Sequence, residues 1–172
     1  MTEMLIDRYD LRLLATLQGN GHATNAELGE KAGLSASQAS RRVQRLQEGG
    51  MITGYTALLD PAALGLGVTA YAQILLERHD TSRPQDFEKQ VAALPEVLEC
   101  FAVTGEADYV LRIVVQDLAA FSELMMKKLL TLPGVAQVKT SIALSRVKET
   151  HALPLAHISK PPPKVRRVRY TG

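Results

Sequence analysis

The chain lacks the residue spacings that mark most metal-dependent and nucleotide-dependent enzymes. Its histidines are scattered, at His22, His79, His151 and His157, and no Gly-rich phosphate loop is present. The single cysteine, Cys100, cannot form an internal disulfide and has no surrounding pattern that is typical of a nucleophile. These absences predict a protein that is not an enzyme and that binds no metal and no cofactor.

Long apolar runs are also missing from the sequence. There is no stretch of eighteen apolar residues and no charged start followed by an apolar signal region. We therefore expect a cytoplasmic protein without membrane contacts. Hydrophobic residues make up 46% and charged residues 22% of the 172 residues, which is typical of a globular protein that buries a core. Cys100 lies in the apolar run LECFAV, which favours a buried structural thiol over a redox switch.

Acidic residues are absent from the last twenty positions. Residues 153–172 contain Lys160, Lys164, Arg166, Arg167 and Arg169, together with three consecutive prolines. Such a composition predicts a flexible, basic, Pro-rich tail over residues 156–172. It is consistent with salt-sensitive contacts to DNA phosphates and equally with a solvated tail that has no partner.

The segment TNAELGEKAGLSASQASRRVQRL predicts two short amphipathic helices joined by a tight turn. Thr24 with Glu27 forms one capping box, and Ser35 with Gln38 forms a second. Gly33 lies between them, where the end of the first helix needs a residue that tolerates a positive φ. This arrangement is typical of a DNA-reading helix-turn-helix.

The second of these helices has one apolar and one polar face. Ala39, Val43 and Leu46 form the apolar stripe. A polar face rich in arginine is often merely solvated, but here no acidic residue pairs with the three arginines within the helix, which favours DNA contacts. The predicted DNA-binding residues are Ser35, Ser37, Gln38, Ser40, Arg41, Arg42, Gln44 and Arg45.

The surrounding sequence completes a winged helix-turn-helix domain over residues 1–60. A first helix is expected from Asp7 to about Asn20, and Gly49 and Gly50 end the second helix of the motif. Met51–Leu59 is predicted to form a short strand or wing. Residues 61–67, which contain two glycines, are predicted to be a linker.

A second domain is predicted over residues 68–155, where the pattern changes from helical to alternating. The expected strands cover residues 68–77, 97–104, 109–115 and 135–148, and the expected helices cover residues 84–94 and 117–130. The order βαββαβ is that of a ferredoxin-like fold, so the whole chain is of the α+β class.

The strands of this domain are apolar on both sides. Ala70, Ala72 and Ile74 alternate with Tyr71 and Leu75. Because two helices cover only one side of a four-stranded sheet, a monomer would expose a large apolar patch. We therefore expect a homodimer joined through the sheets, which would suit a two-fold operator.

Several segments together resemble the Lrp/AsnC family of leucine-responsive, or feast-famine, transcription regulators. They are DRYDLRLLATLQ, TNAELGEKAGLS, RRVQRLQEGGMITGY, VTGEADYVLRI and VKETHALPL, in this order from Asp7 to Leu155. The resemblance implies a regulator that binds double-stranded DNA and forms dimers through the second domain. It also implies assembly of dimers to a tetramer or octamer and a small effector, usually an amino acid, bound between dimers.

The resemblance also implies an effector site at the Gly-x-x-Asp-Tyr turn between the second and third strands. Its residues here are Gly105, Glu106, Asp108 and Tyr109, and hydroxyls on the last strand are added from Thr140 and Ser141. A carboxylate can bind the open amides of the turn, and Asp108 can receive an ammonium group. The alternative is an ordinary hairpin turn in which Asp108 bonds backbone amides.

One difference from the family concerns the start of the recognition helix. Many relatives have a proline and a bulky residue there, whereas this chain has Ala36, Ser37, Ala39 and Ser40. The preferred DNA sequence is therefore open. A second hypothesis is a nucleoid-associated protein that wraps DNA with little sequence selectivity and no effector.

Overall fold

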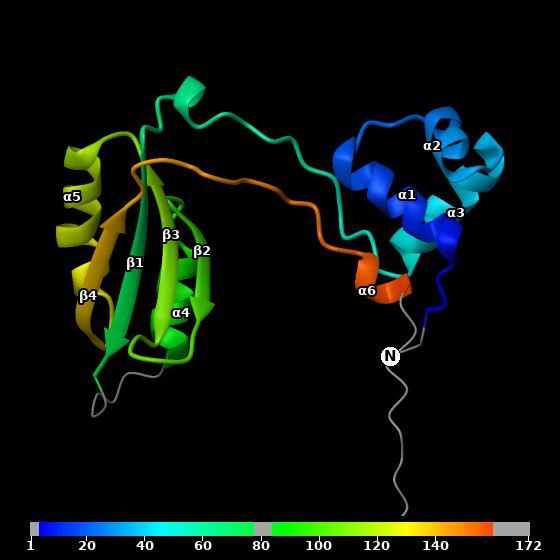
Figure 1. Cartoon of the computed structure of the whole chain (residues 1–172). Helices are drawn as coiled ribbons and strands as arrows, with labels where there is room; N and C mark the ends of the chain where they lie inside the picture. Colours follow the sequence, from blue (N-terminus) through cyan, green and yellow to red (C-terminus); the bar gives the residue numbers. More distant parts are fainter. Residues whose placement is uncertain (1–3, 78–83, 160–172) are drawn as a thin grey trace, which may run out of the picture. The chain divides into compact units, whose positions relative to one another are not determined.

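The computed structural model describes residues 4–77 and 84–159 of the chain (Figure 1). Its contacts divide the chain into two compact units. The first contains the described residues up to Ala57 together with those from Glu149 onward, and the second contains Leu58–Lys148. The sequence predicts boundaries at residues 60 and 155. Residues 149–155 were therefore expected in the second unit, but they group with the first.

Three helices form the first unit, and each begins at a side chain that caps it. They are α1 (Arg8–Gly19), α2 (Asn25–Ala32) and α3 (Ala36–Glu48). The capping boxes predicted at Thr24 and Ser35 are confirmed, because both hydroxyls accept a bond from the backbone three residues later. Asp7 forms a third capping box at the start of α1.

The turn between α2 and α3 depends on two glycines. Gly33 has a φ of +76°, as predicted for a helix end. Gly29 was not singled out from the sequence, yet a Cβ there would lie 2.7 Å from the carbonyl oxygen of Leu34. The close approach of the two helices buries Leu28 and Ala39. The turn therefore sets how α3 packs on the rest of the unit.

Met51–Leu59 forms no strand, and most of its side chains are exposed. None of the strand pairings among the described residues involves this segment. Because a strand needs a partner backbone for its hydrogen bonds, the segment cannot form a ladder by itself. The strand prediction is wrong here.

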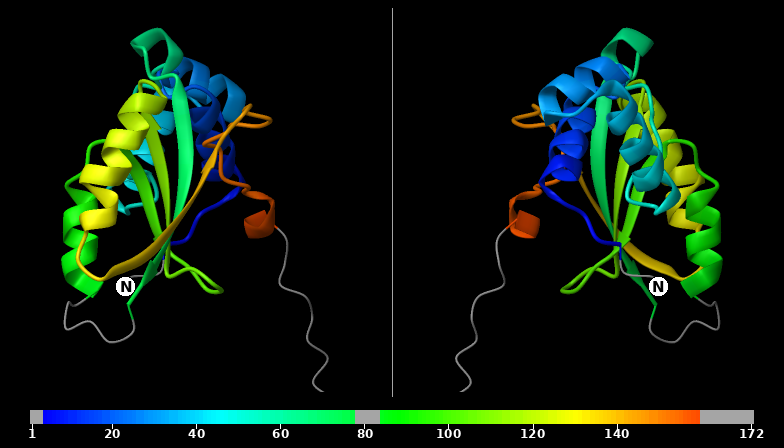
Figure 2. Two further views of the ribbon diagram at one scale, coloured as in Figure 1. Left: turned by 90° about the vertical axis from the view of Figure 1, so that its left-hand side faces the viewer. Right: turned by 90° about the vertical axis from the view of Figure 1, so that its right-hand side faces the viewer.

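The second unit is a four-stranded antiparallel sheet with the order β2-β3-β1-β4. Its strands are β1 (Val68–Leu76), β2 (Val97–Ala102), β3 (Tyr109–Val115) and β4 (Val135–Ile142). The helices are α4 (Pro84–Ala92) and α5 (Leu118–Lys127), with short 3-10 turns η1 (Ala62–Leu64) and η2 (Leu129–Thr131). Both α4 and α5 cover the same face of the sheet (Figure 2). This arrangement confirms the predicted βαββαβ order.

The last strand is shorter than the sequence predicts. β4 ends at Ile142, which pairs with Ala70, and the amide of Ala143 makes one further bond to Thr69. The same register places Leu144 opposite Val68, where β1 begins, so residues after Leu144 have no β1 backbone to pair with. The strand predicted to continue to Lys148 is therefore wrong beyond Ile142.

The face of the sheet opposite the helices is more polar than the sequence pattern suggests. Tyr71 and Phe101 are exposed there. Between them lies an ion pair, because the Arg112 guanidinium is 2.8 Å from the Glu99 carboxylate. Charged groups on β2 and β3 thus interrupt the apolar surface predicted for this face.

Cys100 is exposed, so the prediction of a buried thiol is wrong. It pairs with the buried Leu111, but β2 is an edge strand and five of its six residues are exposed. An edge strand has a neighbour on one side only, which leaves even its apolar residues accessible.

Helix α6 (Ala156–Ser159) occupies the start of the predicted tail. The rest of that tail, including its five basic residues, lies outside the described residues. No helix within the described ranges has the length and apolar composition needed to cross a membrane.

We expect the phenol of Tyr109 to make stability fall at alkaline pH. Its hydroxyl donates to Glu88 Oε1 at 2.8 Å, and its ring centroid lies 4.7 Å from that of Phe87. Burial, followed by the bond to Glu88, raises its pKa to about 12, against about 10 in an unfolded chain. The unfolded chain therefore loses this proton first, and stability present below pH 10 is lost as pH rises toward 12.

Urea denaturation at pH 8, 10 and 11 checks this expectation. Tyr109→Phe should lose about 1 kcal/mol at pH 8 with the hydrogen bond and should show a smaller further loss at pH 11 than the wild type. Tyr55→Phe, a change at an exposed tyrosine outside the sheet, is the matched control. An equal alkaline loss in the wild type and Tyr109→Phe would contradict the assignment.

Candidate functional site

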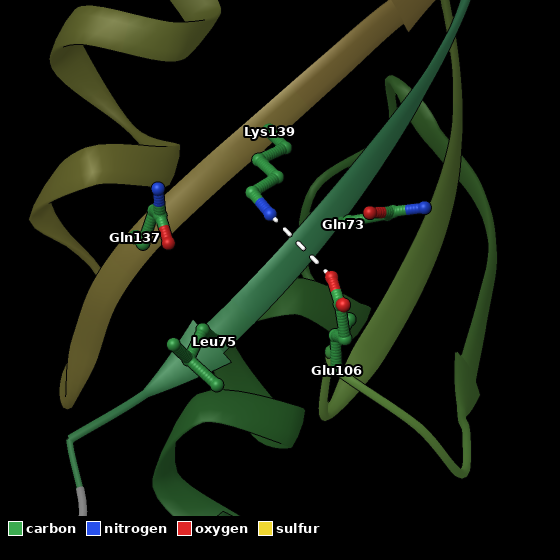
Figure 3. Close-up of a pocket in the computed structure, with 6 residues that line it drawn as sticks. Gln73, Leu75, Glu106, Gln137 and Lys139 are labelled. Carbon is green, nitrogen blue, oxygen red and sulfur yellow. Dashed lines mark ion pairs between the residues drawn. The ribbon is translucent and has the colours of Figure 1, made fainter.

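The loop between β2 and β3 borders a small hollow on the face of the sheet opposite the helices. Gly105 has a φ of +118°, and the amide of Val103 donates to the carbonyl of Asp108 to close the loop. The hollow is lined by Gln73, Leu75, Glu106, Ala107, Gln137 and Lys139 (Figure 3). β1, β4 and the loop therefore contribute side chains to one place.

Opposite charges face each other across this hollow. Lys139 Nζ lies 3.7 Å from Glu106 Oε2, and the Glu106 side chain is 94% exposed (Figure 3). A pair at this distance and exposure contributes little to stability. Both groups are thus available to a ligand that carries an ammonium and a carboxylate, while Leu75 offers an apolar contact.

The predicted ligand Asp108 is already engaged by the protein. Its Oδ2 accepts a bond from the amide of Leu76 at 2.8 Å, and its own amide donates to the carbonyl of Ile74 at 2.9 Å. The register between β1 and β4 shifts between Leu75 and Leu76, where strand pairing alone is irregular. Asp108 therefore ties the loop to the end of β1.

The structure does not bring the six predicted effector residues together. Tyr109 is buried and bonds Glu88, whereas Thr140 pairs with Ala72 and Ser141 pairs with Tyr71. Because successive residues of a strand face opposite sides, Thr140 lies on the helix-covered face and Ser141 on the open face. Of the predicted six, Glu106 lines the hollow and Gly105 adjoins it.

Sequence reasoning missed three polar residues of the hollow, Gln73, Gln137 and Lys139. A signal for them existed in the alternation of the strands. Gln73 lies between the buried Ala72 and Ile74, which marks it as pointing to the other face.

On α3, most of the predicted DNA-binding residues are exposed. Ser35 and Gln38 are engaged in the capping box, and the Ser35 and Ser37 hydroxyl oxygens lie 3.2 Å apart. Gln44 donates to Glu48 Oε1 at 2.8 Å. Ser40 is exposed, and Arg41 is an exposed side chain without a hydrogen bond or ion pair to any described residue.

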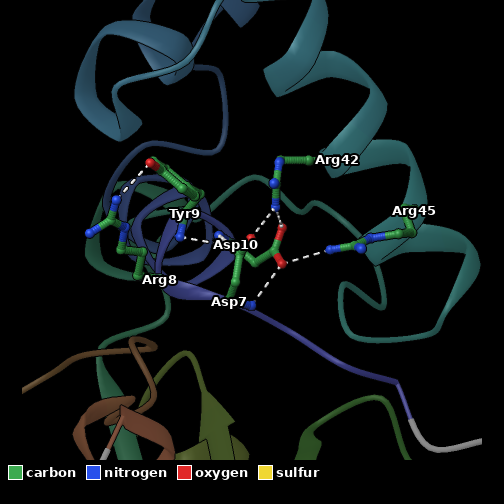
Figure 4. Close-up of polar contacts among 6 residues, drawn as sticks. All are labelled: Asp7, Arg8, Tyr9, Asp10, Arg42 and Arg45. Carbon is green, nitrogen blue, oxygen red and sulfur yellow. Dashed lines mark hydrogen bonds and ion pairs between the residues drawn. The ribbon is translucent and has the colours of Figure 1, made fainter.

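Arg42 and Arg45 instead bind a carboxylate on α1 (Figure 4). The Asp10 side chain is 1% exposed, and it accepts from Arg42 Nη1 at 2.9 Å and from Arg45 Nη2 at 2.6 Å. Arg42 also donates to Asp7 Oδ2 at 2.9 Å. The bond from the Asp10 amide, together with Arg42, lowers the pKa of Asp7 below its usual value.

The sequence analysis considered acidic partners within α3 alone, but Arg42 and Arg45 have acidic partners elsewhere in the unit. The partners lie on α1, more than thirty positions earlier in the chain. A sequence signal was present, since Asp10 precedes Leu13, Leu14 and Leu17 by three, four and seven residues and so shares their buried face. An acid on that face needs a buried partner.

Comparisons with known proteins match both units. Residues 6–53 match the family described as winged helix-turn-helix DNA-binding, and residues 69–153 match the Lrp/AsnC ligand binding domain. A Bkd operon transcriptional regulator from Pseudomonas aeruginosa is 39% identical over 150 residues, covering 87% of this chain and 98% of that protein. The leucine-responsive regulatory protein of Escherichia coli K12 is 37% identical, covering 86% and 90%.

Solved structures agree with these sequence matches. A transcriptional regulator from Neisseria meningitidis in complex with L-Met has a TM-score of 0.86 and 39% identity, covering 90% of this chain and 99% of that one. Escherichia coli AsnC has a TM-score of 0.76 at 26% identity, covering 88% and 100%. The α+β fold predicted from the sequence is confirmed, and the chain belongs to the Lrp/AsnC family of DNA-binding transcription regulators.

Proposed function

We propose that the protein is a sequence-specific transcription regulator in which α3 reads DNA and the loop after β2 senses an amino acid. The observation that carries this proposal is that the three arginines of α3 have different environments. Arg42 and Arg45 are held by Asp10, while Arg41 is exposed and unpaired among the described residues. One arginine is thus available for base edges and two fix the helix.

Ser37, Arg41 and Gln44 are spaced by four and three residues and lie along one exposed face of α3. Arginine can bind the O6 and N7 atoms of guanine, and glutamine can bind the N6 and N7 atoms of adenine. Ser35, Gln38 and Ser40 would contribute at the start and flank of the helix, and the remaining N–H donors of Arg42 and Arg45 would face phosphates.

The effector is proposed to be an amino acid in the hollow lined by Glu106 and Lys139. Its ammonium would bind Glu106 and its carboxylate Lys139, with Leu75 against an apolar side chain. The L-Met complex of the relative from Neisseria meningitidis supports this class of ligand. Gly105 and Asp108 would shape the loop.

We infer a homodimer that covers the open sheet face, where Tyr71 and Phe101 are exposed. Dimers would assemble further to a tetramer or octamer, with the effector between dimers. Effector binding would then change how the dimers pack and so the spacing of the α3 helices presented to DNA.

A second candidate function is DNA wrapping with little sequence selectivity. The observation that favours it is the charge of residues 153–172, which contain five basic and no acidic residues. The ratio of affinities for a selected operator and for unrelated DNA separates the two functions, because a wrapping protein binds both almost equally.

Arg41→Ala should reduce this ratio by about fivefold or more, because one bidentate base contact contributes about 1–3 kcal/mol of discrimination. Folding stability should change by less than about 0.5 kcal/mol, since the side chain is exposed. Fluorescence anisotropy with an operator selected in vitro and a scrambled duplex measures both affinities. Equal weakening of both duplexes would show that Arg41 contacts phosphate only.

Arg42→Ala and Arg45→Ala should each cost about 1 kcal/mol of stability or less, because the other arginine still pairs with Asp10. The double variant leaves a buried carboxylate without an arginine and should cost about 3 kcal/mol, more than the two single changes together. Urea denaturation measures the difference. Adding Asp10→Asn to the double variant removes the buried charge and should recover part of the lost stability. If the double variant loses only the sum of the two single losses, the role given to Asp10 is wrong.

Saturation with the cognate amino acid should raise the thermal midpoint, because a ligand at a hundred times its Kd adds about 2.7 kcal/mol. A screen of the twenty amino acids identifies it. Glu106→Gln should abolish the shift without lowering the midpoint of the free protein, since its side chain is almost fully exposed. Asp108→Ala is the contrasting variant, and it should lower the midpoint with and without ligand by releasing Leu76. A full shift in Glu106→Gln would exclude this hollow.

A further inference from the structure

A second hollow lies on the helix-covered side of the sheet, away from the loop that contains Glu106. Its volume is about 400 Å³, which is within the range typical of small-molecule sites. Residues from α5, from the end of β3 and from the turn before β2 line it. The loop after β2 adjoins the first residue of β3, Tyr109, whereas this hollow adjoins the last, Val115, about 20 Å further along the strand. The two hollows are therefore separate.

Part of the wall of this second hollow is apolar. Val115 and Leu124 are buried beneath it, and Ala120 on the preceding turn of α5 is half-buried. Alanine has a short side chain, so this stretch of α5 leaves room for a ligand. Such a surface fits a short aliphatic or aromatic group and offers it no polar contact.

One oxygen of the Glu96 carboxylate, in the same wall, lacks a hydrogen-bond donor. Its Oε1 accepts from Lys128 Nζ at 2.7 Å, but Oε2 is buried and accepts no bond from any described residue. The bond from Lys128 lowers the pKa of Glu96 below its usual value, so the carboxylate is charged at neutral pH. An ionised oxygen without a donor is unfavourable, and a ligand that brings an N–H group would relieve it. The Glu96 side chain is 28% exposed, so a small rotation presents this oxygen to the hollow.

A lysine with a weakly held ammonium lies at the rim of the hollow. Lys127 Nζ is 2.6 Å from Glu123 Oε1 on the preceding turn of α5, and both side chains are mostly exposed. An exposed pair of this kind contributes little to stability. Lys127 can therefore turn to the carboxylate of a ligand with little loss.

We propose that this hollow binds a small molecule with an ammonium group on a short apolar body, either a primary amine or an amino acid. The ammonium would donate to Glu96 Oε2, and the apolar body would contact Val115 and Leu124. If the ligand is an amino acid, Lys127 would bind its carboxylate. The site does not depend on the effector hollow at Glu106, on DNA reading by α3, or on the open sheet face proposed for the dimer.

Three probes with the same branched carbon chain test this chemistry on the full-length protein. Leucine has both charged groups, 3-methylbutylamine lacks the carboxylate, and 4-methylpentanoate lacks the ammonium. In NMR spectra of the ¹³C-labelled leucine and valine methyl groups, the amine and leucine should shift the signals of Val115 and Leu124, and the acid should not. Tighter binding of leucine than of the amine would assign the site to amino acids, and the reverse order would assign it to amines. The proposal is wrong if no probe at millimolar concentration shifts these signals, or if only the acid does.

Variants of single residues locate the bound ammonium. Glu96→Gln should weaken amine binding about tenfold or more, because a hydrogen bond to a charged group is lost. Glu123→Gln, the same change at the exposed rim, is the matched control and should leave the affinity nearly unchanged. Equal weakening in both variants would overturn the role of Glu96, since it would mean that the amine responds only to the general negative charge.

A third variant tests the space rather than the charge. Ala120→Leu keeps every charged group and fills the hollow, so it should abolish the shifts at Val115 and Leu124. Leu75 methyl signals report on the Glu106 hollow in the same spectra. If leucine shifts Leu75 alone, the proposed effector site stands and this second site is wrong. If the amine shifts Val115 and Leu124 and no amino acid shifts Leu75, the second site stands and the effector site fails.

Discussion

The DNA-binding unit depends on one buried carboxylate. Asp10 is fully buried, and its carboxylate accepts hydrogen bonds from the guanidinium groups of Arg42 and Arg45 on α3 and from the backbone amide of Asp7. A buried charge is tolerated only when it is paired and hydrogen-bonded. The bonds that offset the burial of the Asp10 charge therefore also fix the position of α3 on α1. These bonds also affect the face of α3 that is proposed to read DNA. They leave Arg41 as the arginine of α3 without an acidic partner in the described part of the chain.

A second aspartate has a comparable position in the sheet domain. Asp108 closes the irregular end of β1 through Leu76 and Ile74, and this fixes a loop whose neighbouring side chain, Glu106, remains exposed. Each unit therefore has an aspartate with a structural role and an exposed charged group nearby in the sequence, since Glu106 is two residues before Asp108 and Arg41 adjoins Arg42, which binds Asp10. Substituting the aspartate and substituting the exposed group have different consequences, since the first changes stability and the second changes recognition.

Local features of the sequence predicted most of the fold. The capping boxes at Thr24 and Ser35 and the turn at Gly33 depend on neighbouring residues, and they were found where expected. The wrong predictions concern residues whose partners are distant in the sequence. The acids that bind Arg42 and Arg45 come from another helix, and β4 ends at Ile142, which lies opposite Ala70 near the start of β1. Of the candidate effector residues, the turn motif located Glu106, but the facing Lys139 required the register of β4 against β1.

The bonds from Arg42 and Arg45 to Asp10, which hold α3 on α1, also constrain how an effector would act in the proposed mechanism. The Glu106 hollow belongs to the sheet unit, whereas α3 is fixed to α1 within the other unit by bonds to Asp10. The residues that line the hollow and the residues that hold α3 are different and belong to different units. A conformational change needs a difference in interaction free energy between two states. In the mechanism that we propose, this difference arises where the hollow meets another copy of the chain, and assembly and DNA affinity are then linked reciprocally. Sensing by this protein is for that reason expected to be a property of the oligomer, while base reading and phosphate contact remain properties of each DNA-binding unit.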